Sequence, residues 1–279
     1  MSPRPTRSVT PLQQKTSALT VALGEYDTGW HNAPASLSRA REIARNAKAA
    51  GADVLLLPEM FATGFTMEAA EFAEPESGPI AKQVSGIAAE HELWILAGIS
   101  VRKPDGRFVN TAMLFSPRGE ATATYEKQRL FVYANENEIY SSGEQQSIVE
   151  INEVRAGVLI CFDLRFPELF REIAPDVDAF FLIANWPQSR QHHWDVLTRA
   201  RAIENQCYMV AVNRTGEGGG LQYAGGSVAY DPSGNRCDEA VPNSSLRIAR
   251  LSTDAVHHAR KSFPISSFVQ RAPISSRAT

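Results

Sequence analysis

Cysteine is scarce in this chain, which limits both the cellular compartments and the kinds of cysteine chemistry that fit the sequence. Three cysteines occur among 279 residues, at positions 161, 207 and 237, and no two of them form a Cys-x-x-Cys pair. An odd number of thiols with this spacing cannot build a complete disulfide framework. We therefore expect a reducing, cytoplasmic environment rather than a secreted disulfide scaffold.

Long apolar runs and a strong charge of one sign are also missing. No run approaches the ~20 residues of a transmembrane helix, and the basic N-terminal segment lacks the apolar stretch of a signal peptide. The formal net charge is −3, with no basic patch of the kind that nucleic acids or membranes attract. We expect no nucleic-acid or membrane partner. Residues 1–16 are interpreted as a flexible leader, and residues 17–279 as one domain.

Common motifs for metals, phosphates and serine nucleophiles are absent as well. There is no Gly-x-Ser-x-Gly elbow. His192 and His193 are adjacent and point apart on a helix, so they lack the i, i+4 spacing of a zinc pair. The glycine-rich segment 216–220 leads to a strand rather than a helix, which predicts a flexible loop and not a phosphate site. Cys207 fits a core position and Cys237 a peripheral hairpin. We expect no metal and no cofactor.

The apolar periodicity predicts an α/β domain in which strand–helix units are mixed with hairpins. The last long helix carries Val196, Ala200 and Ile203 on one face. Mixed sheets covered by helices are expected. The expected strands are 18–23, 53–59, 93–101, 147–152, 154–160, 179–185 and 207–213, with hairpins at 111–127 and 226–240 and helices at 36–50, 79–91, from 167 onward and 189–206.

Cys161 stands where a strand meets a helix. In GVLICFDLRFPE the strand is expected to end at Ile160 and the helix to begin at Pro167. The thiol would then lie on a sharp turn that exposes it and aims backbone N–H groups at it. A nearby helix N-terminus favours the thiolate form. A buried structural cysteine is an equally good interpretation of this position.

Two charged residues follow other strands. Glu59 comes directly after an apolar run, where a carboxylate suits a general base, although a salt bridge at the edge of a sheet explains it equally well. Lys127 ends another strand and could hold the charge that an oxyanion needs, whereas most such lysines are solvated. No histidine sits in a motif that marks it as the partner of Cys161. A carboxylate must then serve as the base, and Glu59 is the candidate.

These residues lie in stretches that resemble the nitrilase superfamily, the carbon–nitrogen hydrolases with a Glu-Lys-Cys catalytic set. The matches are LLPEMF, YEKQRLF, ICFDLRFPELFR and the longer segment 184–214, which occur in the family's order. The resemblance covers residues 18–265. EMFATGFTMEAA and ANWP resemble the omega-amidase branch, which hydrolyses the terminal amide of 2-oxoglutaramate and 2-oxosuccinamate.

The resemblance implies a four-layer α-β-β-α sandwich whose outer layers pair into a homodimer or larger homo-oligomer. It implies that Glu59 is the base and that Cys161 forms a thioester. Lys127 and the backbone N–H of Phe162 would bind the oxyanion. Glu136, in a polar segment that is otherwise typical of solvent-facing acids, aligns with a second family glutamate that orients the lysine. Many relatives have tyrosine where Phe162 stands, so a hydroxyl is lost there while the N–H remains.

The resemblance also suggests residues that bind the substrate. Arg165 aligns with an arginine used by a relative acting on N-carbamoyl amino acids, and Arg190 is a second candidate for the substrate carboxylate. For Arg165 the alternative is a structural salt bridge within RFPE. Phe61, Phe131 and Trp186 lie beside the motifs and could wall a narrow pocket. Core packing is the alternative for each of the three.

The expected activity is hydrolysis of the terminal amide of a small 2-oxo acid to the dicarboxylate and ammonia. An N-carbamoyl-amine amidase or a deaminated-glutathione amidase would carry the same catalytic set with a different pocket. A rival of another class is a binding protein on an inactive hydrolase fold. The presence of Glu59, Lys127 and Cys161 together argues against that rival.

Overall fold

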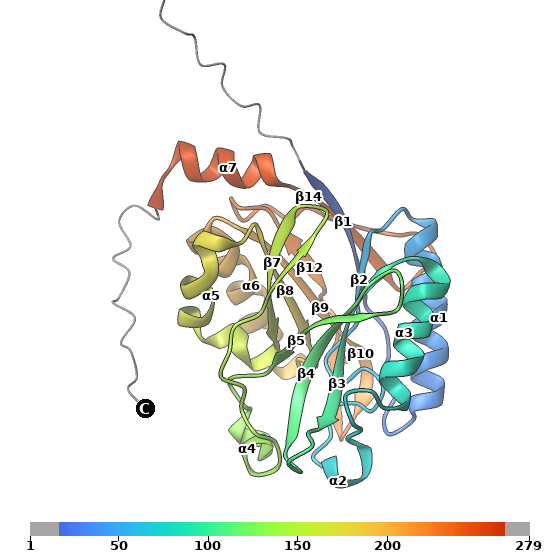
Figure 1. The fold of residues 1–279 in the computed structure, drawn as a ribbon. Coiled ribbons are helices and arrows are strands. Elements are labelled where there is room, and N and C mark those ends of the chain that lie inside the picture. The colour runs from blue at the N-terminus through green and yellow to red at the C-terminus, as the bar shows by residue number, and fades with distance from the viewer. Residues whose placement is uncertain (1–16, 266–279) are drawn as a thin grey trace, which may run out of the picture.

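The computed structural model describes residues 17–265 as two facing β-sheets, each covered on its outer side by helices (Figure 1). The larger sheet has the order β13-β14-β1-β2-β3-β4-β5, and the smaller has the order β12-β9-β8-β7-β6. The strands of the larger sheet are β1 (Ala18–Gly24), β2 (Val54–Leu56), β3 (Trp94–Arg102), β4 (Phe108–Phe115), β5 (Ala121–Glu126), β13 (Asp238–Ala240) and β14 (Leu246–Ser252). Those of the smaller sheet are β6 (Ile148–Ile151), β7 (Val154–Ile160), β8 (Ala179–Ala184), β9 (Tyr208–Asn213) and β12 (Val228–Tyr230).

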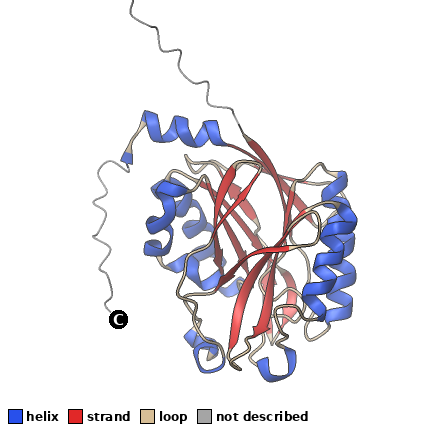
Figure 2. Cartoon of the chain, in the orientation of Figure 1, coloured by secondary structure: helices blue, strands red, loops and turns tan. Residues whose placement is uncertain are grey.

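Helices form the two outer layers, as the flanking blue ribbons in Figure 2 show. The larger sheet is covered by α1 (Ala33–Ala49) and α3 (Pro79–His91), and the smaller by α5 (Pro167–Ile173) and α6 (Gln191–Asn205). The remaining elements are α2 (Ala69–Phe72), α4 (Glu136–Ile139), α7 (Thr253–Ser262), the hairpin of β10 (Thr215–Gly218) with β11 (Leu221–Ala224), and 3₁₀ turns at Val132–Ala134, Cys161–Arg165, Ala174–Asp176 and Gln188–Arg190.

Side-chain alternation along the strands produces the layers. In β2, Val54 and Leu56 point into the core between the two sheets, whereas Leu55 packs with the α1 and α3 side. Successive strand side chains point to opposite faces, so a strand that is apolar on both faces must be covered on both. The expected α-β-β-α sandwich is confirmed. Because β2 is buried on both faces, it is visible in the sequence as an unbroken apolar run.

Several element boundaries differ from the prediction for local reasons. Helix α1 begins at Ala33 rather than at Ser36, because the Asn32 side chain caps it by accepting the N–H of Ala35 at 3.2 Å. The segment 216–220 is not a flexible loop: it belongs to the β10–β11 hairpin, with positive φ at the glycines of the turn. Glycine adopts such angles without the steric cost that other residues meet.

The predicted hairpin at 226–240 forms around its turn, where Tyr230 and Arg236 make an antiparallel bridge, but its outer strands join different sheets. The turn itself forms at Asp231, but β12 pairs with β9 while β13 pairs with β14 in the other sheet. The buried carboxylate of Asp238 accepts the N–H of Ala229 at 2.8 Å and forms ion pairs with Arg236 and Arg247. These contacts direct the second strand to β14, and no local pattern reveals them.

The prediction of an apolar face on α6, the helix expected at 189–206, is also wrong. Val196 and Ile203 are 51% and 45% exposed on α6. The helix instead buries Trp194, Thr198 and Ala202 against the smaller sheet. A polar residue such as Thr198 is accommodated because its hydroxyl donates to the Trp194 carbonyl at 2.7 Å. A hydrophobicity count assigns such a residue to the wrong face.

The central strands place the site. Strands β1, β2 and β3 run parallel in one sheet, and β7, β8 and β9 run parallel in the other. Their carboxyl ends are where α/β architectures form ligand sites. Glu59 follows β2, Cys161 follows β7, and Asn185 follows β8.

Candidate active site

Cys161 occupies the turn predicted from the sequence. It opens the 3₁₀ turn that follows β7, and helix α5 begins at Pro167. Its φ is +44°, a conformation that costs a residue with a side chain on the order of 1 kcal/mol or more. The turn places the sulfur on the wall of a cavity, where Sγ lies 3.7 Å from the carbonyl oxygen of Asn185.

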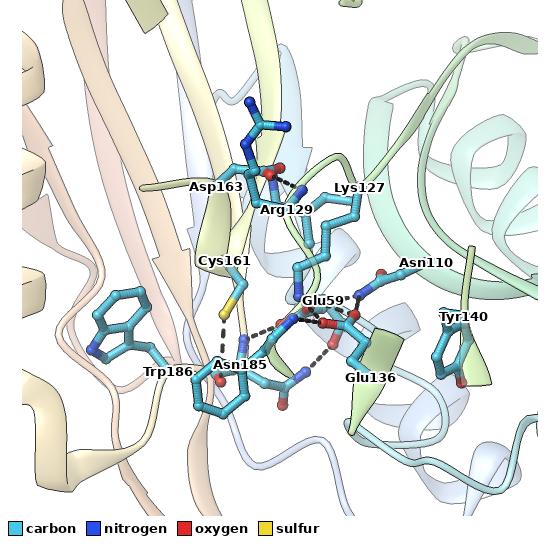
Figure 3. Close-up of polar contacts among 12 residues, drawn as sticks. Glu59, Asn110, Lys127, Arg129, Glu136, Tyr140, Cys161, Asp163, Asn185 and Trp186 are labelled. Atoms are coloured by element: carbon cyan, nitrogen blue, oxygen red, sulfur yellow. Dashed lines mark hydrogen bonds and ion pairs between the residues drawn. The ribbon is translucent and has the colours of Figure 1, made fainter. Parts of the chain in front are cut away.

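Four buried side chains behind the thiol form what we call the charge cluster: Glu59, Asn110, Lys127 and Glu136 (Figure 3). The Lys127 ammonium donates to Glu59 Oε1 at 2.9 Å and to Glu136 Oε2 at 2.9 Å. The Asn110 amide donates to the same two carboxylates at 2.7 and 3.0 Å. Glu136 also accepts the backbone N–H of Phe131 at 2.6 Å. Because buried charges are costly without partners, this mutual pairing is what allows them to lie inside the protein.

Electrostatics in the cluster favour a charged lysine and a protonated thiol. Burial alone would lower the pKa of Lys127, but the carboxylates of Glu136 and Glu59 hold it above its ordinary value. Burial raises the pKa of Cys161 well above its ordinary value, and the charge of Glu59 raises it further, while Lys127 lowers it. A thiol in this environment reacts once a base removes its proton, and Glu59 is the adjacent carboxylate.

Asn185 joins Glu59 to Cys161. Its backbone N–H donates to Glu59 Oε2 at 2.9 Å, and its side-chain amide donates to the Glu59 carbonyl. Its own carbonyl accepts the Cys161 thiol. Neither Asn110 nor Asn185 is predicted as a site residue from the sequence. Asn185 carried a signal, because it directly follows a buried strand in the ANWP match.

The cavity in front of Cys161 has a volume of about 320 Å³ and a largely aromatic wall. Five of the predicted residues besides the catalytic set line it: Phe131, Phe162, Arg165, Trp186 and Arg190. The rings of Phe131 and Phe162 lie 5.0 Å apart, and the Arg165 guanidinium lies 5.8 Å from the Phe162 ring and 4.8 Å from the Trp186 ring. Phe61 is the exception. It is fully buried in the core beneath α1 and α3 and does not line the cavity, so its expected role as a pocket wall is wrong. The full wall comprises Trp30, Phe65, Thr66, Met67, Glu68, Lys127, Phe131, Ala134, Cys161, Phe162, Arg165, Asn185, Trp186, Pro187, Arg190, Gly218, Gly219, Leu221 and Tyr223.

Two arginines bring positive charge to this wall. The Arg165 guanidinium lies 4.8 Å from the centre of the Trp186 ring, and that of Arg190 lies 5.1 Å from the Phe131 ring. Within residues 17–265 no carboxylate forms an ion pair with either arginine. The salt bridge considered within RFPE is not formed, because Glu168 pairs with Arg129 at 3.6 Å instead. Burial and the charge of Arg190 lower the pKa of Arg165. Glu68 also lines the cavity, but neither guanidinium pairs with it, and two neighbouring guanidiniums that form no ion pair suit an anionic ligand.

The β10–β11 hairpin supplies a wall of the cavity that is not predicted from the sequence. Gly218 and Gly219 line the cavity, and a Cβ on either would meet the Trp30 ring at 3.0 or 2.8 Å. Arg214, fully buried, donates to Asp27 at 2.7 Å and to the Glu217 carbonyl at 2.9 Å. It thereby ties the hairpin to the loop that carries Trp30. The glycines are required for the close approach of this ring.

Comparisons with known proteins assign the chain to a family. A model of the carbon-nitrogen hydrolase family matches residues 20–261. The chain belongs to the carbon–nitrogen hydrolase family. An omega-amidase of Yersinia enterocolitica is 38% identical over 214 residues, which cover 76% of this chain and 82% of that protein. A 2-oxoglutaramate amidase of Bacillus subtilis is 33% identical over 217 residues, which cover 77% and 83% of the two chains.

Solved structures support the same assignment. A CN-hydrolase superfamily protein from Xanthomonas campestris superposes with a TM-score of 0.85 at 30% identity, covering 91% of this chain and 98% of that one. The predicted membership of the carbon–nitrogen hydrolase family, with its sandwich fold and hydrolytic action on amides, is confirmed. The roles of the individual site residues stay predictions. Within residues 17–265, no helix has the length and apolar character needed to cross a membrane.

Proposed function

We propose that this carbon–nitrogen hydrolase is an omega-amidase that releases ammonia from the terminal amide of 2-oxoglutaramate or 2-oxosuccinamate. The observation that carries the proposal is the pair of guanidiniums, Arg165 and Arg190, on the wall of the same cavity as the Cys161 thiol. A short 2-oxo acid places a carboxylate at one end and an amide at the other. The arginines would hold the first while the thiol meets the second. The omega-amidase relatives support the same substrate class.

The reaction begins with proton transfer from the thiol to Glu59. The sulfur attacks the amide carbon, and the oxyanion of the tetrahedral intermediate is held by Lys127 and by the backbone N–H of Phe162. Glu59 returns its proton to the departing nitrogen, so ammonia leaves and a thioester remains on Cys161. A water molecule then gives a proton to Glu59 and attacks the thioester. Collapse of the second intermediate releases the acid and restores the thiol.

Glu136 serves this sequence through Lys127. It binds the ammonium through both carboxylate oxygens at 2.9 and 3.1 Å and is itself fixed by the Phe131 N–H. Since the lysine is clamped between two carboxylates, its ammonium is held in place before the oxyanion forms. A preorganised donor stabilises an oxyanion strongly because it needs no reorganisation when the charge develops.

A substrate panel tests the proposed activity. The purified full-length protein should release ammonia from 2-oxoglutaramate or 2-oxosuccinamate, and Cys161→Ala should abolish this without changing the thermal unfolding temperature. Turnover of an N-carbamoyl amine or of deaminated glutathione, with no ammonia from either 2-oxo acid, would overturn the omega-amidase assignment. Full activity of Cys161→Ala would overturn the mechanism. Activity unchanged by a chelator is expected, because no step requires a metal.

Charge-neutral variants test the contribution of each arginine to substrate binding separately. Arg165→Gln and Arg190→Gln should each raise the KM for 2-oxoglutaramate by about 10-fold or more, since each removes a charge-assisted hydrogen bond of ~1.5–3 kcal/mol. Arg129→Gln is the matched control. Arg129 pairs with Glu168 at 3.6 Å and its guanidinium lies outside the cavity wall. A KM that stays at the wild-type value in both cavity variants contradicts their role in binding the carboxylate.

The assembly state and location complete the proposal. We propose a cytoplasmic homodimer or larger homo-oligomer that pairs through its outer helical layer. The exposure of Val196 and Ile203 on the outer face of α6 supports this surface. Light scattering of the wild type and of Val196→Asp tests it. A monomeric wild type, or a dimer that persists unchanged in the variant, contradicts this interface.

A further inference from the structure

Asp163 is a buried carboxylate whose role the mechanism above leaves unassigned. It lies two residues after Cys161 and is 0% exposed. Three donors converge on it: the Tyr125 hydroxyl at 2.8 Å, the Arg129 backbone N–H at 2.9 Å and the Ile160 backbone N–H at 3.0 Å. Figure 3 shows its contact with Arg129 beside the catalytic side chains. Within residues 17–265 it forms no ion pair, so the three donors and the nearby charge of Lys127 are what oppose the rise that burial causes in its pKa.

The donors come from two segments of the chain that meet at this carboxylate. Tyr125 and Arg129 stand two residues before and two residues after Lys127, so they bracket the lysine. Ile160 directly precedes Cys161 and ends β7. Tyr125 belongs to β5 of the larger sheet, whereas Ile160 belongs to the smaller sheet. The carboxylate therefore links the lysine segment to the cysteine turn across the two sheets.

We propose that Asp163 is a positioning residue whose carboxylate fixes the Cys161 thiol relative to the Lys127 ammonium. The proposal rests on the proposed function in one respect, since it takes Cys161 as the nucleophile. The link matters because the turn at Cys161 has a left-handed backbone, which needs its surroundings to hold it. A displacement of about 1 Å between reacting groups can cost ~10²-fold in rate.

The pKa of the Cys161 thiol reports its position, because the charges that face the thiol shift that pKa. Glu59 from the end of β2 and Glu136 from α4 raise the pKa of Cys161, and Lys127 from the end of β5 lowers it. If Lys127 moves away from the sulfur, the pKa of the thiol rises. The direct effect of removing the negative charge at Asp163 has the opposite sign, because a nearby negative charge disfavours a thiolate. The sign of the change therefore separates positioning from simple electrostatics.

Asp163→Asn is the informative variant. Asparagine keeps the shape of the side chain but has one acceptor oxygen instead of two. It therefore loses either the hydrogen bond from Arg129 or those from Tyr125 and Ile160. Tyr125→Phe removes one link to the lysine segment and leaves the carboxylate. Asp178→Asn is the matched control, because Asp178 likewise accepts a backbone N–H, that of Arg155 at 3.0 Å, at the opposite end of β7.

The experiment measures the rate of alkylation of Cys161 by iodoacetamide as a function of pH, with the modified peptide identified by mass spectrometry, together with kcat and KM. Asp163→Asn should shift the alkylation profile to higher pH and lower kcat by about 10- to 100-fold with little change in KM. Tyr125→Phe should shift the profile in the same direction by less, and Asp178→Asn should match the wild type.

An unchanged profile, or one shifted to lower pH, in Asp163→Asn overturns the proposal, as does an equal effect of Asp178→Asn. If Asp163→Asn does not fold, Tyr125→Phe decides, since a wild-type profile in that variant also overturns it. The alkylation assay needs no substrate. A wild-type protein that hydrolyses no 2-oxo amide would sink the proposed function while leaving this test intact.

Discussion

Replacing Lys127 by Met is the sharpest perturbation of the charge cluster. The substitution keeps most of the side-chain volume and removes the ammonium that lies 2.9 Å from both Glu59 and Glu136. All three side chains are 0% exposed. At an effective dielectric constant of about 20, one ion pair at about 4 Å is worth ~4 kcal/mol. Removing one partner of a buried pair typically costs ~3–5 kcal/mol, because a charge is left without compensation.

We therefore expect Lys127→Met to lower the free energy of unfolding by ~3–5 kcal/mol and to lower kcat by ~10²–10³-fold through loss of an oxyanion donor. Urea unfolding at neutral pH measures the first quantity, and ammonia release measures the second. Both are read on the same preparation, with kcat taken from the folded fraction below the unfolding transition.

Lys103→Met is a control with the same chemistry in a different place. Lys103 also binds two carboxylates, those of Glu76 at 2.7 Å and Glu126 at 2.9 Å, but its side chain is 22% exposed. Ion pairs near solvent are worth ~0–1 kcal/mol, so this variant should lose little stability and no activity. The reasoning is refuted if the two variants unfold at the same urea concentration, or if Lys127→Met keeps more than about a tenth of the wild-type kcat.

Three further outcomes follow from the geometry. Phe61→Ala should cost ~3–5 kcal/mol of stability and leave the KM of the folded enzyme unchanged, because the ring fills the core and not the cavity; a raised KM at unchanged stability would contradict this. Gly219→Ala should raise the KM several-fold, since its Cβ would lie 2.8 Å from the Trp30 ring and the residue has a φ of +57°; a wild-type KM would show that this wall does not touch the substrate. Burial raises the pKa of Asp163 to about 6, above its value in the unfolded chain. The folded state therefore binds this proton more tightly than the unfolded state. The resulting contribution to the free energy of unfolding is complete below the unfolded pKa and is lost as the pH rises through about 6. The free energy of unfolding of the wild type relative to Asp163→Asn should therefore fall by up to ~3 kcal/mol between pH ~4 and ~7, and a difference that stays flat in a urea series would contradict it.

The positions of Cys161 and Glu59 could be predicted because they depend on local chain features. Each follows a strand whose apolar run is visible in the sequence, and parallel strands bring their carboxyl ends to one edge of a sheet. The turn after β7 was predictable for the same reason, since Pro167 marks the first position of α5. What the residues alone could not decide was whether the thiol was reactive. That depends on groups that lie far away in the chain.

The remaining site residues depend on such distant pairing. Asn185 binds Glu59 across 126 positions, and Asn110 binds the same carboxylate across 51. A neutral amide carries no pattern that reveals its partner. Glu136 lies in a polar segment typical of solvent-facing acids, yet it is fully buried, and only the resemblance to the family indicated its place.

Phe61 shows the opposite error, in which nearness in the chain is mistaken for nearness in space. It stands two residues after Glu59, but Met60 between them has a φ of +41° and the chain turns there. The aromatic ring then packs in the core beneath α1 and α3 while the carboxylate joins the charge cluster. The backbone conformation at Met60 is what sends the two side chains to different places, and the hydrophobicity of the side chains does not reveal that conformation.

The pairing of β1 with β14 has a consequence for how the protein is made. Residue Val21, near the start of the described chain, pairs with Ala249 near its end. During synthesis the ribosome releases Glu59, Lys127 and Cys161 well before β14, so the proposed catalytic groups have all left the ribosome while the larger sheet still has an open edge. Pairing between strands far apart in the chain slows folding, and an unpaired strand edge can form hydrogen bonds with another chain and so lead to aggregation. Strand β14 (Leu246–Ser252) therefore closes this edge of β1 last, and truncation within β14 should yield an aggregating product rather than a shorter enzyme.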